Sequence, residues 1–552
     1  KPMVCRYPFR ERKMSQFPKL QKLRQCYQPQ LPKILQNLER LIAHSQEKKG
    51  NLLNSTTKLL PKISGQPTLH FFEEKNASQH RPLRIGTVLS GGPAAGGHNV
   101  IIGLFDSLKK LNPQSQLFGF LNGPGGIIGN KYIELKNEIL QPYRNQGGFD
   151  LIGSGRAKIE TPEQFKETEK TVNDLKLDGL VIIGGDDSNT NAALLAEHFL
   201  NQDISTKVIG VPKTIDGDLK NEYIEVSFGF DTATKTYSEI VGNVLRDCLS
   251  QKKYYFFIKL MGRSASHIAL ECALQTHPNL TLIGEEIASK QQTLQEITNQ
   301  ICNVICARAS KGKNYGAILI PEGIIEFIPE SKKLIKELNA LPPNTDRHTA
   351  VNQLGEEAKR CFNAIPKGIQ EQLLLDRDPH GNIRVSQIET ERLFIETVQN
   401  ELNSRASKGQ YSGKLDAQPL FCGYEGRSCF PSNFDSQYCY ALGYGAALLI
   451  NGGATGYMCC MQNLACPVEE WRFAGIPLAD MIHFEDRGGK SKPVIKKALV
   501  ELERKPFKTF MGQRESWILN DDYRYPGPIQ FFGPRELTDC ITMTLQLESR
   551  SI

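Results

Sequence analysis

Short apolar runs recur along the chain from Arg84 onward, and each leads through a glycine-containing loop into a stretch with helical spacing. The runs are RIGTVLSGG, SQLFGFLNGPGG, GLVIIGGDD, TKVIGVPKTIDGD, YYFFIKLMGR, LTLIGEE and GAILIPEG. Repeated strand, loop and helix patterns are typical of βαβ units in an α/β protein with a largely parallel sheet. Ligands of such sheets bind at the carboxyl ends of the strands. We therefore expect the functional residues in these loops.

Two segments depart from this rhythm. Leu31, Ile34, Leu38, Leu41 and Ile42 recur at helical spacing, which predicts an amphipathic helix within a mainly helical extension over residues 1–80. Residues 326–415 are rich in Lys, Glu, Gln and Arg and predict a helical insertion, after which ALGYGAALLINGGATGYM returns to the α/β pattern.

Length and composition narrow the class of protein. The 552 residues predict two to four domains, with 39% hydrophobic and 23% charged residues as in soluble globular proteins. Apolar runs are far shorter than the roughly 18 residues of a membrane span, and we expect no secretory signal. A formal net charge of +7, without dense basic runs, favours anionic small molecules over nucleic acid.

The 14 cysteines contain no CxxC pair, so we expect free thiols in a reducing, cytoplasmic compartment rather than a zinc site.

The first glycine loop is LSGGPAAGGHN, Leu89 to Asn99. Its glycines would let backbone N–H groups approach an anion near the N-terminus of the following helix. The match to a dinucleotide or Walker loop is poor, so an ordinary tight turn and a phosphate cradle are both open.

Two adjacent carboxylates follow the strand in VIIGGDDSNT. Asp186 stands where a carboxylate could hold a hard cation bound to phosphate oxygens. Asp187 or Ser188 could instead cap the next helix.

The loop PKTIDGD places Lys213, Thr214, Asp216 and Asp218 within six residues. The two aspartates alternate and can face one pocket. A carboxylate there could accept a proton from a substrate hydroxyl during phosphoryl transfer, and Lys213 could stabilise the transferring group. The alternative is that DGD is only a turn.

Other loops add charge at strand ends. Arg263 suits bidentate recognition of phosphate, whereas His267 is expected to be a packed or hydrogen-bonded residue rather than a catalyst. The remaining candidates are Arg156, Glu322, Tyr424 and Arg427. Cations and carboxylates together are the groups that metal-assisted phosphoryl transfer needs.

The order GGPAAGGHN, GGDDS, PKTIDGD, MGRSASHIALE, PEG, GYEGR resembles the phosphofructokinase family, and within it the long diphosphate-dependent branch. The resemblance implies two Rossmann-like parallel-sheet domains. It places a diphosphate and magnesium domain at residues 81–230 plus about 430–510, and a fructose 6-phosphate domain at 231–429 with the insertion. Residues 511–552 would be a C-terminal extension.

The resemblance also implies residue roles. Asp216 would accept the proton of the 1-hydroxyl of fructose 6-phosphate, Asp186 would bind Mg²⁺, and Gly92 and Arg156 would bind diphosphate. Lys253 and Tyr254 would reach the sugar site of a neighbouring subunit, which implies at least a homodimer. The other sugar-phosphate residues would be Thr214, Ile215, Met261, Gly262, Arg263, Glu322, Tyr424 and Arg427.

Two positions would select the phosphoryl donor. Relatives that use ATP generally have glycine where this chain has Asp187 and Lys213. A carboxylate at 187 would repel an α-phosphate by roughly 4 kcal/mol at 4 Å and an effective dielectric of 20. Lys213 would stabilise the transition state, so diphosphate is the expected donor.

The chain also departs from the pattern, with Ala95 in place of proline and Ala157 in place of aspartate; the second change leaves the surroundings of Arg156 open. The resemblance thus implies phosphoryl transfer from diphosphate to fructose 6-phosphate, a step of glycolysis and gluconeogenesis. Three alternatives are an ATP-dependent enzyme, a non-catalytic regulatory subunit and a nicotinamide-binding protein. The intact GGDDS and TIDGD motifs oppose the regulatory subunit. The absence of GxGxxG in the first unit opposes the last alternative.

Overall fold

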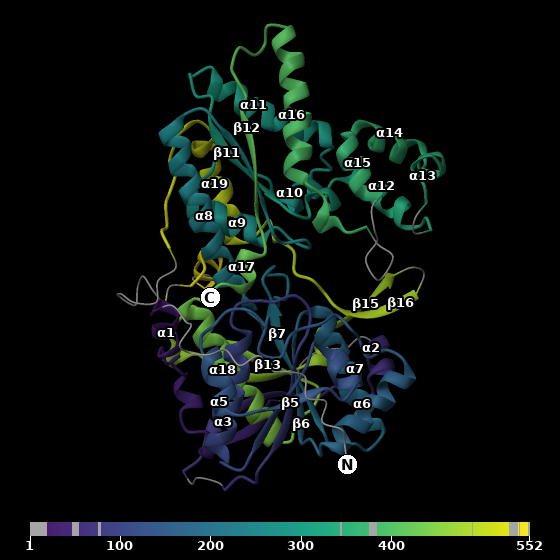
Figure 1. Cartoon of the computed structure of the whole chain (residues 1–552), viewed down its shortest axis with the longest axis vertical. Helices are drawn as coiled ribbons and strands as arrows, with labels where there is room; N and C mark the ends of the chain where they lie inside the picture. Colours follow the sequence, from purple (N-terminus) through teal and green to yellow (C-terminus); the bar gives the residue numbers. More distant parts are fainter. Residues whose placement is uncertain are drawn as a thin grey trace.

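A computed structural model describes residues 19–46, 54–75, 79–342, 345–374, 383–487, 490–528, 539 and 541–549. Figure 1 shows two lobes, a lower one built on a large sheet and an upper one built on a smaller sheet. In the described part of the chain no helix is long and apolar enough to cross a membrane. The described cysteines are free thiols, and most of them are buried.

The large sheet has the strand order β1-β2-β14-β13-β7-β6-β3-β4-β5, with β8 (Phe228–Gly229) paired to β7. Five central strands run parallel, and the outer ones run antiparallel to their neighbours. The central strands are β13 (Tyr457–Gln462), β7 (Lys207–Thr214), β6 (Gly179–Gly184), β3 (Arg84–Leu89) and β4 (Gln116–Phe120), and the outer ones are β1 (Leu41–Gln46), β2 (Thr68–Glu73), β14 (Arg472–Pro477) and β5 (Tyr132–Leu135).

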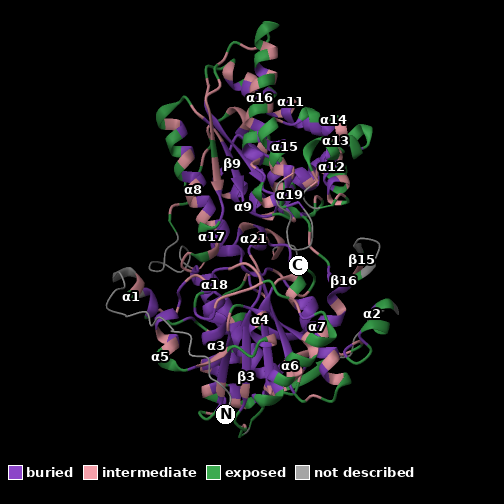
Figure 2. Cartoon of the chain, turned by 45° about the vertical axis from the view of Figure 1, so that its right-hand side comes forward, coloured by how far each residue is buried: buried purple, intermediate pink, exposed green. Residues whose placement is uncertain are grey.

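Side chains of the central strands alternate between two apolar cores. On β6, Val181 and Ile183 join the core that includes helices α3 (Gly97–Leu111) and α18 (Asn433–Asn451). Leu180 and Ile182 join the other core, under α7 (Asp186–Asn201). Because both faces are covered, the strand is a continuous apolar run, as parallel strands usually are. Figure 2 shows these buried strands between more exposed helices.

The small sheet is fully parallel, in the order β10 (Leu280–Thr281), β11 (Gly316–Pro321), β9 (Tyr255–Leu260), β12 (Ala417–Cys422). The predicted α/β class with two Rossmann-like parallel-sheet units is therefore confirmed. Helices also occupy the predicted insertion: α12 (Pro329–Asn339), α13 (Arg347–Gln353), α14 (Glu356–Ala364), α15 (Lys367–Leu374) and α16 (Thr390–Ser407).

The amphipathic helix predicted between Leu31 and Ile42 is wrong. The residues form two 3-10 turns, Lys33–Leu35 and Leu38–Arg40, and then enter β1. An apolar spacing of three also suits a 3-10 turn, and the pairing of β1 with β2 removes the rest of the segment from a helix. Strands β1 and β2 thus extend the large sheet. The domain boundaries predicted above stay a prediction.

Candidate active site

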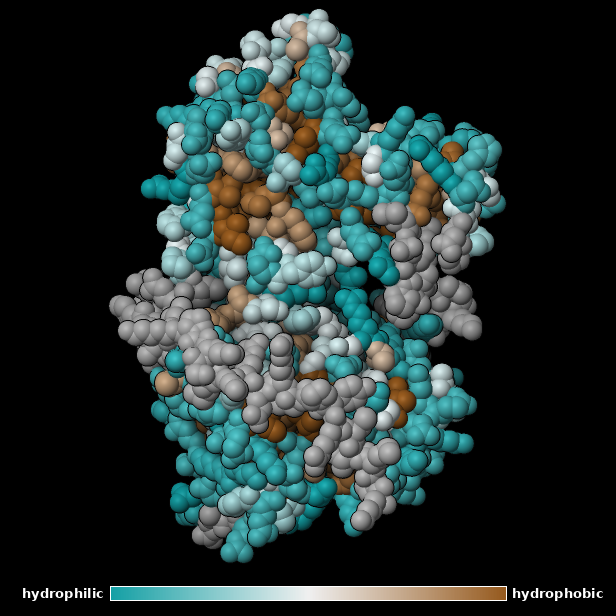
Figure 3. All heavy atoms as spheres, viewed as in Figure 1, coloured by the Kyte–Doolittle hydropathy of each residue, from teal (hydrophilic) through white to brown (hydrophobic). Residues whose placement is uncertain are grey.

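A cleft of about 330 Å³ lies where the strand ends of the large lobe face the small lobe. Figure 3 shows a hollow between the lobes that is rimmed largely by hydrophilic residues. Ten of the predicted site residues line the cleft: Gly92, Arg156, Asp186, Asp187, Lys213, Thr214, Ile215, Asp216, Arg263 and Arg427. Most of these residues follow strands of the large sheet, whose carboxyl ends share one edge. Arg263 and Arg427 follow β9 and β12 of the small sheet and reach the cleft from the other lobe.

The first glycine loop leaves room for two cations. An ideal Cβ on Gly92 would lie 2.5 Å from Nη1 of Arg427, and one on Gly91 would lie 3.1 Å from Nζ of Lys213. Gly91 also has a φ of +85°, which favours glycine. The guanidinium of Arg427 therefore reaches the first glycine loop from the segment after β12.

Helix α7 begins at Asp186 with Gly185 as its N-cap, and no side chain makes a cap hydrogen bond. The hypothesis that Asp187 or Ser188 caps this helix is therefore wrong. The Asn189 side chain instead donates to the carbonyls of Gly184 and Gly185, which holds the turn after β6. Ser188 donates to Ser90 in the glycine loop at 2.8 Å. Both aspartates lie in the first turn, where the helix dipole stabilises negative charge.

Asp187 is 54% exposed at the cleft, and its Oδ1 lies 3.3 Å from Nζ of Lys158. Lys158 also lines the cleft and was not among the predicted site residues. The signal for it was weak, since it is one basic residue two positions after Arg156 in GSGRAKIET. Its positive charge offsets part of the repulsion that Asp187 would exert on an anion.

Lys213 lies near the carboxyl end of β7 and is buried, with 7% of its surface exposed. Burial, and next the nearby Arg427 guanidinium, lower the pKa of Lys213 to about 8, against the opposing effect of Asp216 and Asp186. The ammonium group is thus mostly charged at neutral pH. A bound polyphosphate would favour its charged form further.

The loop after Lys213 turns two carboxylates toward the cleft. The backbone N–H of Asp216 donates to Oγ1 of Thr214 at 3.1 Å, and Gly217 has a φ of +72°. Burial, and next the charge of Asp216, raise the pKa of Asp218 to about 6. Asp218 lines the cleft although the sequence assigned it no separate role. The DGD sequence is therefore a turn that also presents charge to the site.

The small lobe contributes Arg263, in the loop after β9, to the lining of the cleft, and the loop after β11 packs against that loop. The buried Glu322 accepts a hydrogen bond from the N–H of Gly262 at 3.1 Å, and burial raises its pKa. Gly323 passes so close that a Cβ would lie 1.9 Å from the Arg263 carbonyl oxygen. Met261 is 4% exposed and packs in the core beneath this loop. His267 is a hydrogen-bonded packing residue, with Nε2 3.0 Å from the carbonyl oxygen of Ala498.

Six of the predicted residues do not line this cleft: Met261, Gly262 and Glu322, in the loops just described, and Lys253, Tyr254 and Tyr424. Lys253 and Tyr254 precede β9, whereas Arg263 follows it, so the six-residue strand separates them by roughly 20 Å. Tyr424 is 71% exposed at the start of α17 (Glu425–Ser428) and does not line the cleft.

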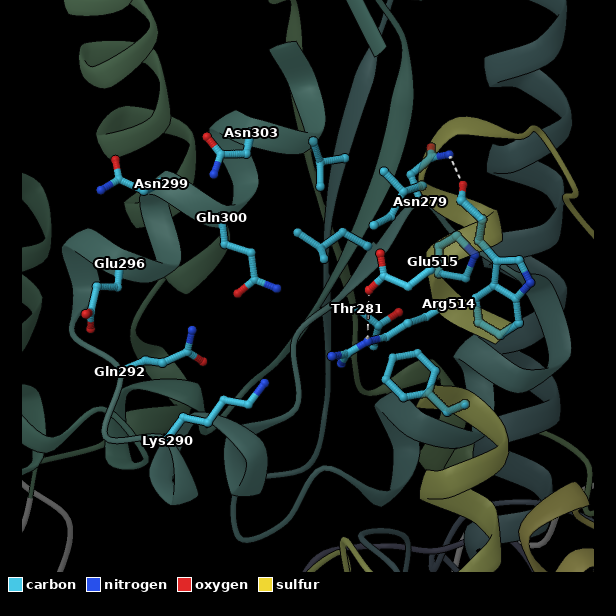
Figure 4. Close-up of a pocket in the computed structure, with 16 residues that line it drawn as sticks. Asn279, Thr281, Lys290, Gln292, Glu296, Asn299, Gln300, Asn303, Arg514 and Glu515 are labelled. Carbon is cyan, nitrogen blue, oxygen red and sulfur yellow. Dashed lines mark hydrogen bonds and ion pairs between the residues drawn. The ribbon is translucent and has the colours of Figure 1, made fainter. Parts of the chain in front are cut away.

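A second cleft, of about 420 Å³, lies in the small lobe between α11 (Leu294–Ala309) and α19 (Lys505–Leu519) (Figure 4). Two of its polar side chains, Asn279 and Arg514, hold α19 in place. Asn279 donates to the Trp517 carbonyl at 3.0 Å, and Arg514 makes two hydrogen bonds to Glu286. This cleft contains none of the predicted site residues.

The cleft between the lobes has the chemistry expected of a magnesium and phosphate site. Among the described residues there is no group of three or more His, Cys, Asp or Glu that forms a preformed metal cage. Mg²⁺ is commonly held by one or two carboxylates together with substrate phosphates, so Asp186 with a bound diphosphate fits this ion.

The family follows from comparison with known proteins. The profile described as Phosphofructokinase matches residues 84–450. The chain belongs to the phosphofructokinase family. It is 53% identical to Pyrophosphate--fructose 6-phosphate 1-phosphotransferase subunit beta 1 of Arabidopsis thaliana, over 94% of this chain and 92% of the relative. It is 50% identical to Pyrophosphate--fructose 6-phosphate 1-phosphotransferase of Treponema pallidum, over 96% of each.

Solved phosphofructokinase structures share the fold. The pyrophosphate-dependent phosphofructokinase of Nitrosospira multiformis superposes with a TM-score of 0.55 at 15% identity, over 82% of this chain and 95% of that one. The resemblance inferred from the motifs is thus confirmed. The matched family region ends before β13 and so does not include the C-terminal segments described above.

Proposed function

We propose that this phosphofructokinase transfers a phosphoryl group reversibly from diphosphate to the 1-hydroxyl of D-fructose 6-phosphate. The products are D-fructose 1,6-bisphosphate and phosphate, a step of glycolysis and gluconeogenesis. The observation that carries the proposal is the match over more than nine tenths of both chains to relatives named for pyrophosphate and fructose 6-phosphate. The presence of both Asp187 and Lys213 in the cleft supports the donor.

The chemistry can be assigned to residues of the cleft. Asp216 takes the proton of the 1-hydroxyl while the oxygen of that hydroxyl attacks the terminal phosphorus of diphosphate. The bridging P–O bond breaks, and phosphate leaves. Lys213 and Arg427 lie beside the glycine loop and would hold the charge of the diphosphate. Arg263 would hold the sugar phosphate on the other side. Asp186 would hold Mg²⁺, which neutralises charge on the diphosphate.

A coupled assay tests donor and activity together. The purified chain is incubated with fructose 6-phosphate and MgCl₂, with diphosphate in one reaction and ATP in the other. We expect fructose 1,6-bisphosphate with diphosphate at a rate at least a hundredfold above that with ATP. Product from ATP alone would identify an ATP-dependent enzyme, and no product from either would favour a regulatory subunit.

We also propose that the active form is at least a homodimer. Lys253 and Tyr254 are too far from the cleft of their own chain to complete it, and they lie at the start of β9, next to the edge strand β12. Apolar residues gather over this part of the upper lobe in Figure 3, and Leu420 is only partly buried there.

The described free thiols support a cytoplasmic location.

Replacing Leu420 by glutamate tests the dimer. We expect the molar mass measured by light scattering to fall to that of one chain, because a charge would be desolvated in the interface. The KM for fructose 6-phosphate should rise about tenfold as the shared site is lost. Phe72→Glu, at a 57% exposed apolar residue of the large lobe, is the control. An unchanged molar mass for Leu420→Glu would reject this interface.

A further inference from the structure

The segment after the β15 (Ile482–Arg487) and β16 (Lys490–Ile495) hairpin joins the two lobes at the mouth of the cleft. We call residues 495–500 the strap. On the large lobe, the N–H of Ile495 donates to Oγ1 of Thr190, and the N–H of Ala498 donates to the carbonyl of Asp218 at 2.7 Å.

On the small lobe, the strap is held by two more hydrogen bonds. The N–H of Val500 donates to Oε1 of Glu285 at 2.9 Å, and Nε2 of His267 lies 3.0 Å from the Ala498 carbonyl oxygen. The backbone on both sides of Lys497 is therefore held by hydrogen bonds, and this fixes where its side chain enters the cleft.

The Lys497 ammonium group lies in the acidic part of the cleft. The Nζ atom of Lys497 lies 3.8 Å from Oδ2 of Asp186 and 3.8 Å from Oδ2 of Asp218. It also donates to Oγ of Ser264 at 2.6 Å. The side chain retains 37% of its exposure, so the ammonium group is still open to the cleft that it lines.

The position of Lys497 differs from that of the other lysine of the site. Lys213 reaches the glycine loop from inside the large lobe, on the proposed diphosphate side. Lys497 comes from the strap, between Asp186 and the Arg263–Ser264 turn of the small lobe. A phosphoryl group passing from diphosphate to the sugar would cross the space between these two cations.

We propose that Lys497 is a further catalytic residue, whose ammonium group binds an oxygen of the transferring phosphoryl group. The inference rests on the proposed function. In the ligand-free site the same ammonium group balances Asp186 and Asp218. It moves from these carboxylates to the phosphoryl oxygen, where positive charge stabilises the transition state. Lys497 lies outside the matched family region, which ends at residue 450.

Kinetics of Lys497→Met provide the first test, with Lys496→Met as the control because Lys496 is its exposed neighbour. We expect Lys497→Met to lower kcat with diphosphate about a hundredfold, as removal of one transition-state contact does. The KM for fructose 6-phosphate should change less than threefold, and Lys497→Arg should restore at least tenfold of the lost rate. Lys496→Met should match the parent chain. A kcat for Lys497→Met within threefold of the parent would overturn the inference.

A binding measurement separates this role from a purely structural one. Imidodiphosphate is titrated calorimetrically in buffer with EDTA, so that metal does not contribute. We expect about tenfold weaker binding to Lys497→Met, with an unchanged midpoint of thermal unfolding. Equal binding of imidodiphosphate by the parent chain and by Lys497→Met would overturn the inference. So would a lowered midpoint of thermal unfolding together with raised KM values for both substrates, because that result would indicate a structural role. If the parent chain has no turnover with diphosphate, the proposed function fails, but this titration still reports whether Lys497 contacts a phosphate.

Discussion

Replacement of Asp216 by asparagine will lower kcat with diphosphate about a thousandfold, within the range that a general base contributes. Asparagine cannot take the proton from the 1-hydroxyl of the sugar. It has nearly the same size, and the backbone N–H of residue 216 can still donate to Oγ1 of Thr214. The fold and the affinity for both substrates should therefore stay close to those of the parent chain.

Steady-state kinetics in both directions, with circular dichroism for the fold, measure this change. Glu222→Gln is the matched control, since Glu222 is an exposed carboxylate on the same loop. The rates of the forward and reverse reactions should fall by the same factor, because the equilibrium constant is unaffected. Turnover of Asp216→Asn within tenfold of the parent would remove Asp216 from the role of base.

Replacement of both Asp187 and Lys213 by glycine will exchange diphosphate use for ATP use. We expect kcat/KM for diphosphate to fall at least a hundredfold, because the buried charge of Lys213 is lost from the site. We expect ATP, a poor donor for the parent chain, to become an efficient one. Asp187→Gly alone should weaken diphosphate use and open the site to ATP only partly.

The structure changes the expected contribution of Asp187. A bare pair of charges would repel by roughly 4 kcal/mol. Because Asp187 is 54% exposed and pairs with Lys158, the electrostatic part should be nearer 1 kcal/mol. Most of the discrimination should then come from the space that the side chain occupies.

Two further variants separate charge from volume. Asp187→Asn keeps the volume and removes the charge, so ATP should stay a poor donor. Lys158→Met leaves Asp187 without this partner and should lower ATP use further in the Lys213→Gly background. If Asp187→Asn accepts ATP as well as Asp187→Gly does, charge rather than space excludes the nucleotide. Unchanged diphosphate kinetics in both Asp187 variants would leave the residue no role in donor choice.

Local sequence predicted which loops meet at the cleft where one motif occupies one strand end. GGDDS and PKTIDGD follow β6 and β7, and those strands are neighbours in the sheet. Their carboxylates therefore meet without any need to know the rest of the fold. The apolar run before each motif was enough to indicate a buried parallel strand.

The sequence by itself thus determined the α/β class, the family, and the loops that form the cleft, because these depend on patterns within single βαβ units. Only the tertiary structure decided which residues join the site from a distance. Lys497 has no motif around it and reaches Asp186 because hydrogen bonds fix the strap to both lobes. Sheet pairing likewise turned residues 41–46 into β1 in place of a helix. In both cases contacts between residues far apart in the sequence stabilise the arrangement, and local hydrophobic periodicity contains no information about such contacts.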